Sequence, residues 1–166
     1  MTLFSVSLML YQFDKNSSPS DWRIVDDVVM GGRSDGSFSI SKEGNGVFEG
    51  TVSLENNGGF SSVRHRATFQ VQARKTIKIR LKGDGSSYQF RVKASANDRH
   101  SYIADFQTSG GWETIDIQLS AMYPAYRGRN LSIPNFDKEK IEEMAFLIGN
   151  KKPQSFRLEI QSIELF

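Results

Sequence analysis

The sequence predicts an all-β protein, a mainly antiparallel β-sandwich with one short helix. Apolar and polar residues alternate with a period of two in several segments, turn residues separate these segments, and a single segment is typical of a helix. A chain of 166 residues with 38% hydrophobic residues and 12 Phe can bury the core that a sandwich needs. We therefore expect residues 1–166 to form one domain.

Strands are expected in about ten segments. The clearest alternation lies in residues 76–82 and 88–93, where apolar residues alternate with Lys, Arg and Gln. The other expected strands are residues 5–13, 22–29, 48–54, 60–69, 101–107, 112–119, 145–149 and 155–165. In the last strand the apolar parity changes between Ile160 and Ile163, which predicts a bulge at Gln161 and Ser162.

The one helix is expected from Asp137 to Met144. Asp137 is a suitable N-cap, and acidic residues fill the turn that follows. This segment is the only one in which the sequence favours a helix over a strand.

Several motifs resemble one known family. The runs WRIVDDVVMGGRS (22–34) and FEGTVSLENNGGFSSVR (48–64) are similar to the signature of the complex I intermediate-associated protein family, an assembly factor of respiratory NADH dehydrogenase. The resemblance implies a galactose-binding-like jelly-roll sandwich, a chaperone-like role in assembling complex I by binding its intermediates, and no cofactor. The residues that carry the motif are Trp22, Asp27, Met30, Gly31, Gly32, Gly58, Gly59, Phe60 and Arg64.

The paired glycines and Asp27 are interpreted as structural. Closely spaced glycines can cradle phosphate, but neither pair has the required spacing or a following Lys, so a positive φ or a close backbone approach is favoured. Asp27 lies among apolar residues, so it is either a metal ligand or general acid, or a carboxylate that accepts backbone hydrogen bonds. We favour the second, with donors from Gly31, Gly32 or Arg64.

The charge is unevenly distributed. Residues 64–99 hold ten Lys or Arg and only two Asp, although the net charge is +2. If residues 83–87 turn a hairpin, Lys78, Arg80 and Lys82 join Arg91 and Lys93 in one outward basic patch, a candidate surface for an anionic partner. In the alternative, Asp105 or Asp116 on a neighbouring strand neutralises the patch, or water solvates it. A second candidate ligand surface is the loop that contains Tyr123, Tyr126 and Arg127.

The sequence argues against an enzyme. Cysteine is absent, the two histidines show no metal-ligand spacing, and no nucleophile-elbow motif occurs. The first ten residues lack a basic side chain and no apolar run approaches a membrane span, so a cytoplasmic protein without a metal or cofactor is expected. The function predicted is binding of a protein partner; the alternatives are a carbohydrate on the concave sheet face, or a nucleic acid or other polyanion.

Overall fold

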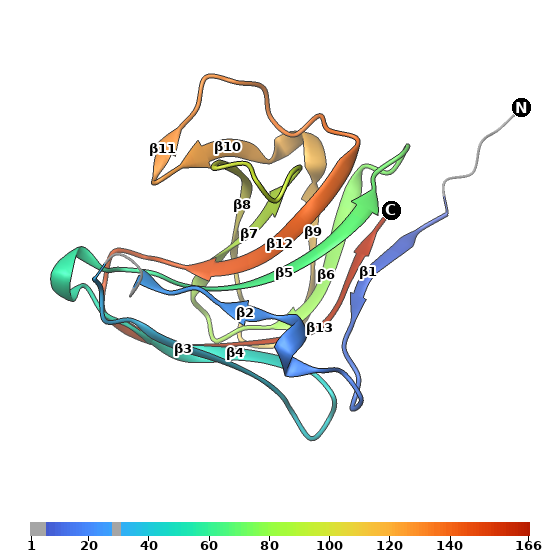
Figure 1. Ribbon diagram of the computed structural model, residues 1–166. Coiled ribbons are helices and arrows are strands. Elements are labelled where there is room, and N and C mark those ends of the chain that lie inside the picture. The colour runs from blue at the N-terminus through green and yellow to red at the C-terminus, as the bar shows by residue number, and fades with distance from the viewer. Residues whose placement is uncertain (1–5, 28–30) are drawn as a thin grey trace, which may run out of the picture.

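The structure, a computed structural model, describes residues 6–27 and 31–166, which form two antiparallel β-sheets packed face to face (Figure 1). One sheet has six strands, in the order β3 (Asp35–Ile40), β4 (Gly46–Val52), β13 (Gln154–Leu165), β6 (Thr76–Lys82) and β9 (Trp112–Gln118), with β1 (Leu8–Gln12) also paired to β13. The other has seven, in the order β11 (Arg129–Asn130), β10 (Tyr123–Tyr126), β8 (Ser101–Gln107), β7 (Ser87–Lys93), β12 (Lys140–Ile148), β5 (Ser61–Gln70) and β2 (Arg23–Ile24). Helical turns in the described residues are short 3₁₀ segments at Pro19–Asp21, Glu55–Asn57 and Leu119–Ala121.

The core fills the space between the two sheets. Phe48 and Leu158 from the six-stranded sheet, and Phe90, Tyr102 and Phe146 from the seven-stranded sheet, are almost completely buried. Each such side chain contributes about 1.5–3 kcal/mol when it leaves water. The residues predicted to face inward in 76–82 and 88–93 are all buried, so the predicted parity of both strands is confirmed.

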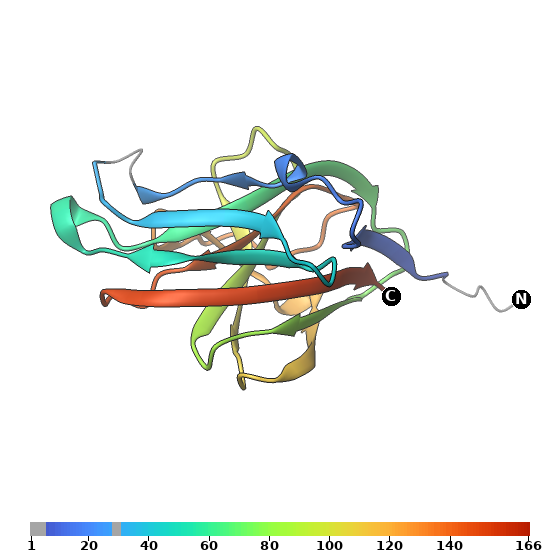
Figure 2. The same ribbon diagram turned by 90° about the horizontal axis from the view of Figure 1, so that it is seen from below.

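β13 is the central strand of the six-stranded sheet. It pairs with β4 along its first half, with β6 along its second half, and with β1 near its end. Figure 2 shows β3, β4 and β13 running side by side, although β13 is the last strand along the chain. The register shifts between Ile160 and Ser162, which confirms the predicted bulge, and the carbonyl of Gln161 accepts a 3.0 Å hydrogen bond from the backbone N–H of Phe13.

The predicted helix from Asp137 to Met144 is wrong. Residues 140–148 form β12, which lies between β5 and β7 in the seven-stranded sheet. A register shift between Ile141 and Glu143 puts both Ile141 and Met144 into the core, and this spacing of three residues imitates the apolar stripe of a helix.

The predicted hairpin of residues 76–93 is also wrong. β6 and β7 belong to different sheets, so the chain crosses the sandwich between them. The carboxylate of Asp84 anchors this crossing, because it accepts hydrogen bonds from the backbone N–H of Arg157 at 2.9 Å and from the hydroxyl of Tyr88 at 3.0 Å. The crossing turns the apolar faces of both strands toward one core and separates basic side chains that would repel each other in a hairpin.

Candidate functional site

Asp27 is a buried anchor for the two glycine motifs. Its Oδ1 accepts a 2.9 Å hydrogen bond from the backbone N–H of Ser34, and its Oδ2 accepts bonds from the N–H groups of Gly59 at 2.6 Å and Phe60 at 3.2 Å, and from the Ser34 hydroxyl. The donors are therefore not those we expected, since Gly32 donates to the backbone carbonyl of Asp27 and Arg64 lies elsewhere. Burial raises the pKa of Asp27, but the hydrogen bonds from Ser34, Gly59 and Phe60 outweigh it and hold the pKa below its usual value.

The four glycines meet two different requirements. Gly31 and Gly59 have φ values of 90° and 146°, a region that favours glycine. Gly32 and Gly58 lie against the carboxylate of Asp27, and a Cβ on Gly58 would stand 2.6 Å from Oδ2. Met30, part of the same motif, falls outside the described residues.

Trp22 belongs to an aromatic cluster at one end of the core. Its ring lies 5.1 Å from that of His65 in a stacked arrangement, 5.7 Å from Phe13 and 5.9 Å from Phe38. The indole is only 3% exposed, so Trp22 packs inside the sandwich and presents no surface for a ligand.

The basic residues predicted to form one patch lie on opposite faces of the molecule. Lys78, Arg80 and Lys82 are on the outer face of the six-stranded sheet, where Lys78 forms an ion pair with Asp116 at 3.7 Å. The Lys78 ammonium lies 5.4 Å from the Phe166 ring centre, and the Arg80 guanidinium lies 5.9 Å from the Trp112 ring centre. Because intramolecular partners engage Lys78 and Arg80, this face is the weaker candidate.

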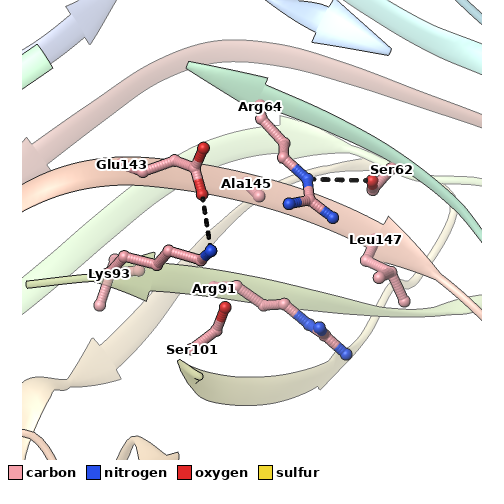
Figure 3. A pocket seen from close by; sticks show the side chains of 9 residues that line it. Ser62, Arg64, Arg91, Lys93, Ser101, Glu143, Ala145 and Leu147 are labelled. Carbon is pink, nitrogen blue, oxygen red and sulfur yellow. Dashed lines mark hydrogen bonds and ion pairs between the residues drawn. The ribbon is translucent and has the colours of Figure 1, made fainter. Parts of the chain in front are cut away.

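Arg91 and Lys93 are on the outer face of the seven-stranded sheet, beside a shallow depression that we call the basic hollow. Its side chains come from β5, β7, β8 and β12, and Figure 3 shows them: Ser62, Arg64, Arg91, Lys93, Ser101, Glu143, Ala145 and Leu147. Arg64 and Arg91 pair in register with Ala145 from either side, so one small residue separates two long cationic ones. The enclosed space is about 10 Å³, room for the centre of one water-sized group.

Both guanidinium groups in the basic hollow lack an acidic partner. No carboxylate of the described residues lies within 4.0 Å of Arg64 or Arg91. Burial and the nearby charge of Arg64 lower the pKa of Arg91 to about 10, and burial also lowers the pKa of Arg64. Glu143 and Asp105 offset the pKa shifts of Arg64 and Arg91 only in part, so the hollow keeps a net positive charge that an anion would stabilise.

Lys93 and Glu143 border the same hollow as a compensated pair. The Lys93 ammonium lies 3.9 Å from Glu143, which also pairs with Arg66 at 3.4 Å, and it donates a 2.8 Å hydrogen bond to the carbonyl of Asp98. Burial lowers the pKa of Lys93, an effect that Glu143 partly offsets. Lys93 is thus less available to a ligand than the two arginines are.

The residues expected in one loop lie instead on β10 and the turn after it. Tyr123 pairs in register with Ile103, and Ile103 pairs with Arg91 on its other side, so all three residues lie on the outer face. The Tyr123 hydroxyl donates a 2.5 Å hydrogen bond to Asp105. Burial and this bond raise the pKa of Tyr123 to about 12. Tyr126 has the opposite parity and is covered by Arg127, whose guanidinium lies 5.4 Å from the ring centre, so the expected pair of ligand-stacking tyrosines does not form.

That Arg64 and Arg91 lie on either side of Ala145 was not predicted from the sequence. The alternation around buried Val63 puts Ser62, Arg64 and Arg66 on the outer face, a signal that was available in the sequence. No local signal shows that β12 inserts between β5 and β7 with an alanine at the facing position, because strand order depends on long-range packing.

Comparison with known families identifies the chain. The sequence profile described as Complex I intermediate-associated protein 30 matches residues 11–160. The chain belongs to this family. One relative is the uncharacterized Schizosaccharomyces pombe protein C9E9.15, which is 28% identical over 94% of this chain and 82% of its own length.

Solved structures show the same fold in other proteins. A family 11 carbohydrate-binding module of Clostridium thermocellum, determined with a mixed-linked tetrasaccharide, has a TM-score of 0.72 at 17% identity and covers 96% of this chain and 95% of its own. The agarase AgWH50C has a TM-score of 0.64 at 10% identity over 96% of this chain and 24% of its own. These similarities confirm the galactose-binding-like jelly-roll sandwich that the sequence predicts.

Neither a cluster of metal ligands nor a membrane-spanning helix is found in the residues that the structure describes. In residues 6–27 and 31–166, no three His, Asp or Glu side chains gather as a metal site would require. None of the helical segments described has the length and apolar character to cross a membrane.

Proposed function

We propose that this member of the complex I intermediate-associated protein family is a non-catalytic binding module, which holds an acidic segment of a protein partner on the outer face of the seven-stranded sheet. The partner would be an assembly intermediate of respiratory complex I or of another protein complex. The observation that carries the proposal is the pair Arg64 and Arg91, two partly buried guanidinium groups without a carboxylate partner in the described residues. Charge complementarity of this kind selects partners and speeds their association.

Family membership supports the choice of a protein partner. The family is named for its association with complex I intermediates, and the matched segment spans nearly the whole sandwich. The carbohydrate alternative has support from the fold alone, and Tyr123, the tyrosine beside the basic hollow, already binds Asp105 through its hydroxyl. The nucleic-acid alternative needs exposed aromatic rings among the cations, and in the part of the chain described such rings, Trp112 and Phe166, lie on the opposite sheet and not in the basic hollow.

The experiment is an affinity capture from an extract of the native host, with the full chain as bait. Wild type is compared with the double variant Arg64→Gln, Arg91→Gln and with the control Lys78→Gln, Arg80→Gln, which removes equal charge from the opposite face. Wild type and control should retain complex I subunits, identified by mass spectrometry, and the double variant should lose them. Retention by all three proteins, or capture of a glycan or of nuclease-sensitive RNA in place of protein, would contradict the proposal.

A further inference from the structure

The two arginines of the basic hollow are held in place by neutral acceptors. The Nε of Arg64 lies 3.4 Å from the hydroxyl oxygen of Ser62, and the Nε and Nη2 of Arg91 donate to the Oε1 of Gln89 at 2.9 and 2.7 Å. Ser62 and Gln89 both pair in register with Leu147, so the two guanidinium groups lean to the same side of Ala145 (Figure 3). Neutral acceptors fix the orientation of each group and leave its charge for a ligand.

A second set of hydrogen bonds fixes these acceptors. The Nε2 of Gln89 donates to Asp105 at 3.0 Å, so its Oε1 must face Arg91. Asp105 is in turn bound by the hydroxyl of Tyr123, and the hydroxyl of Ser62 donates to the carbonyl of Val25 at 2.5 Å. A site whose donors are already oriented loses little conformational entropy when it binds its ligand.

The dimensions of the basic hollow define the group that fits. Arg64 and Arg91 stand one strand to either side of Ala145, so their Cα atoms are about 10 Å apart, twice the spacing between strands. The space between them is about 10 Å³, room for the centre of one water-sized group such as a carboxylate oxygen, while the rest of a ligand would lie outside the hollow. A planar carboxylate matches the guanidinium fork and can be shared by two arginines, while the chain that carries it stays outside.

We infer that Arg64 and Arg91 form a clamp for one side-chain carboxylate of an Asp or Glu in an extended segment of the partner, with Ala145 as its floor. Gln89, Asp105 and Ser62 are positioning residues that act through the arginines. This inference rests on the proposed function, since it names the chemical group that the binding face recognises. A bound carboxylate would also offset the repulsion between the two guanidinium groups, which lie on either side of Ala145.

The direct test is calorimetry of the full-length protein with a short oligoglutamate peptide, with oligoglutamine of the same length as the neutral probe. Wild type should bind oligoglutamate only, and Arg64→Gln and Arg91→Gln should each weaken binding by about tenfold, as expected for losing a charged hydrogen bond. Ala145→Leu keeps all charges and fills the floor, so it should also weaken binding. Arg80→Gln, on the opposite sheet, should bind like wild type.

Asp105→Leu distinguishes two explanations, because they predict opposite changes in oligoglutamate affinity. It removes a negative charge near the clamp, so electrostatics alone predicts tighter binding, whereas loss of the anchor for Gln89 predicts weaker binding. We expect weaker binding, and the same from Gln89→Leu, which changes no charge; thermal melts establish that each variant is folded. Tighter binding by Asp105→Leu together with unchanged binding by Gln89→Leu would overturn the positioning role.

The outcomes separate this inference from the proposed function. If host proteins are captured through Arg64 and Arg91 but oligoglutamate does not bind, the clamp is wrong and the proposed function stands. If oligoglutamate binds through both arginines but no host protein is captured through them, the clamp stands and the proposed function fails. Tighter binding of an oligogalacturonate, which carries carboxylates on sugars, would overturn the assignment to a protein segment.

Discussion

At the scale of single residues, the strongest constraint is the carboxylate of Asp27. Its two oxygens accept hydrogen bonds from Ser34, seven residues away, and from Gly59 and Phe60, more than 30 residues away, so it joins the two glycine motifs. The neighbouring Asp26 accepts bonds from the N–H of Gly36 at 2.7 Å and from the hydroxyl of Ser61 at 2.5 Å. The two adjacent carboxylates therefore bind different donors and stabilise two different contacts.

Asp27→Asn should destabilise the protein. The amide nitrogen replaces an acceptor by a donor facing other donors, which should lower the free energy of unfolding by about 1–3 kcal/mol. Asp35→Asn is the control, because Asp35 is exposed at the start of β3. Denaturant unfolding measures both variants, and equal midpoints for the two would contradict this role of Asp27.

The loss in free energy of unfolding caused by Asp27→Asn should depend on pH. The pKa of Asp27 is lower in the folded protein than in the unfolded chain, where it is about 4. The charged carboxylate therefore stabilises the fold fully above about pH 4. This contribution disappears as the pH falls through the pKa of the folded protein. Melting curves of wild type and variant should therefore converge in acid. A constant difference between them down to low pH would show that the carboxylate charge is not involved.

Gly58→Ala should destabilise the protein through a steric clash. Gly58 has a φ of −72°, which alanine adopts easily, but its Cβ would stand 2.6 Å from Oδ2 of Asp27. We expect a loss of about 1–3 kcal/mol, the usual cost of overpacking. Gly111→Ala is the matched control, because the nearest atom to its Cβ would be 4.0 Å away, and denaturation of both variants should show a loss for Gly58→Ala alone.

At the scale of elements, β12 shows where local sequence reasoning fails. The strand is buried on both faces over most of its length, so it lacks the alternation that identified β6 and β7. Its acidic residues suggested the first turn of a helix, but Glu143 instead pairs with Arg66 and Lys93 across neighbouring strands. The acidic residue fits because β12 lies between β5 and β7, whose basic side chains flank it. The sequence of residues 140–148 alone does not reveal this position.

Glu143→Gln should change stability and ligand binding in opposite directions. The buried carboxylate compensates Lys93, so its loss should lower the free energy of unfolding by about 1–3 kcal/mol. The basic hollow becomes more positive, so oligoglutamate should bind about threefold more tightly, equivalent to about 0.6 kcal/mol. Calorimetry and denaturation measure the two effects, and Glu139→Gln, an exposed change of equal charge, is the control. Weaker binding by Glu143→Gln would contradict the electrostatic account.

At the scale of the whole molecule, sheet membership is what the sequence could not provide. Parity alone identified which residues of β6 and β7 face the core, and the family motifs identified the fold. Whether two successive strands pair or cross depends on contacts such as those of Asp84 with Arg157 and Tyr88. For this reason the outward faces were predicted correctly, but a single patch was predicted where the protein has two.

The separation of the two basic faces predicts a specific salt dependence. Oligoglutamate binding should weaken as salt rises, because ions screen charges beyond about 8 Å at physiological ionic strength. Lys78→Gln, Arg80→Gln should leave this dependence unchanged, since both residues face away from the basic hollow, and Arg64→Gln, Arg91→Gln should abolish it. Calorimetric titrations at several salt concentrations measure the slopes, and equal slopes for the two double variants would show that net charge alone governs binding.

The central position of β13 has a consequence for synthesis in the cell. The ribosome makes β1, β4 and β6 first, and all three keep an unpaired edge until residues 154–165 emerge, because those residues are their partner. A nascent chain thus carries exposed strand edges, the kind of surface that aggregates or recruits chaperones, through most of translation. A premature stop codon before Gln154 would therefore yield no shortened sandwich, but a polypeptide that cellular quality control must remove.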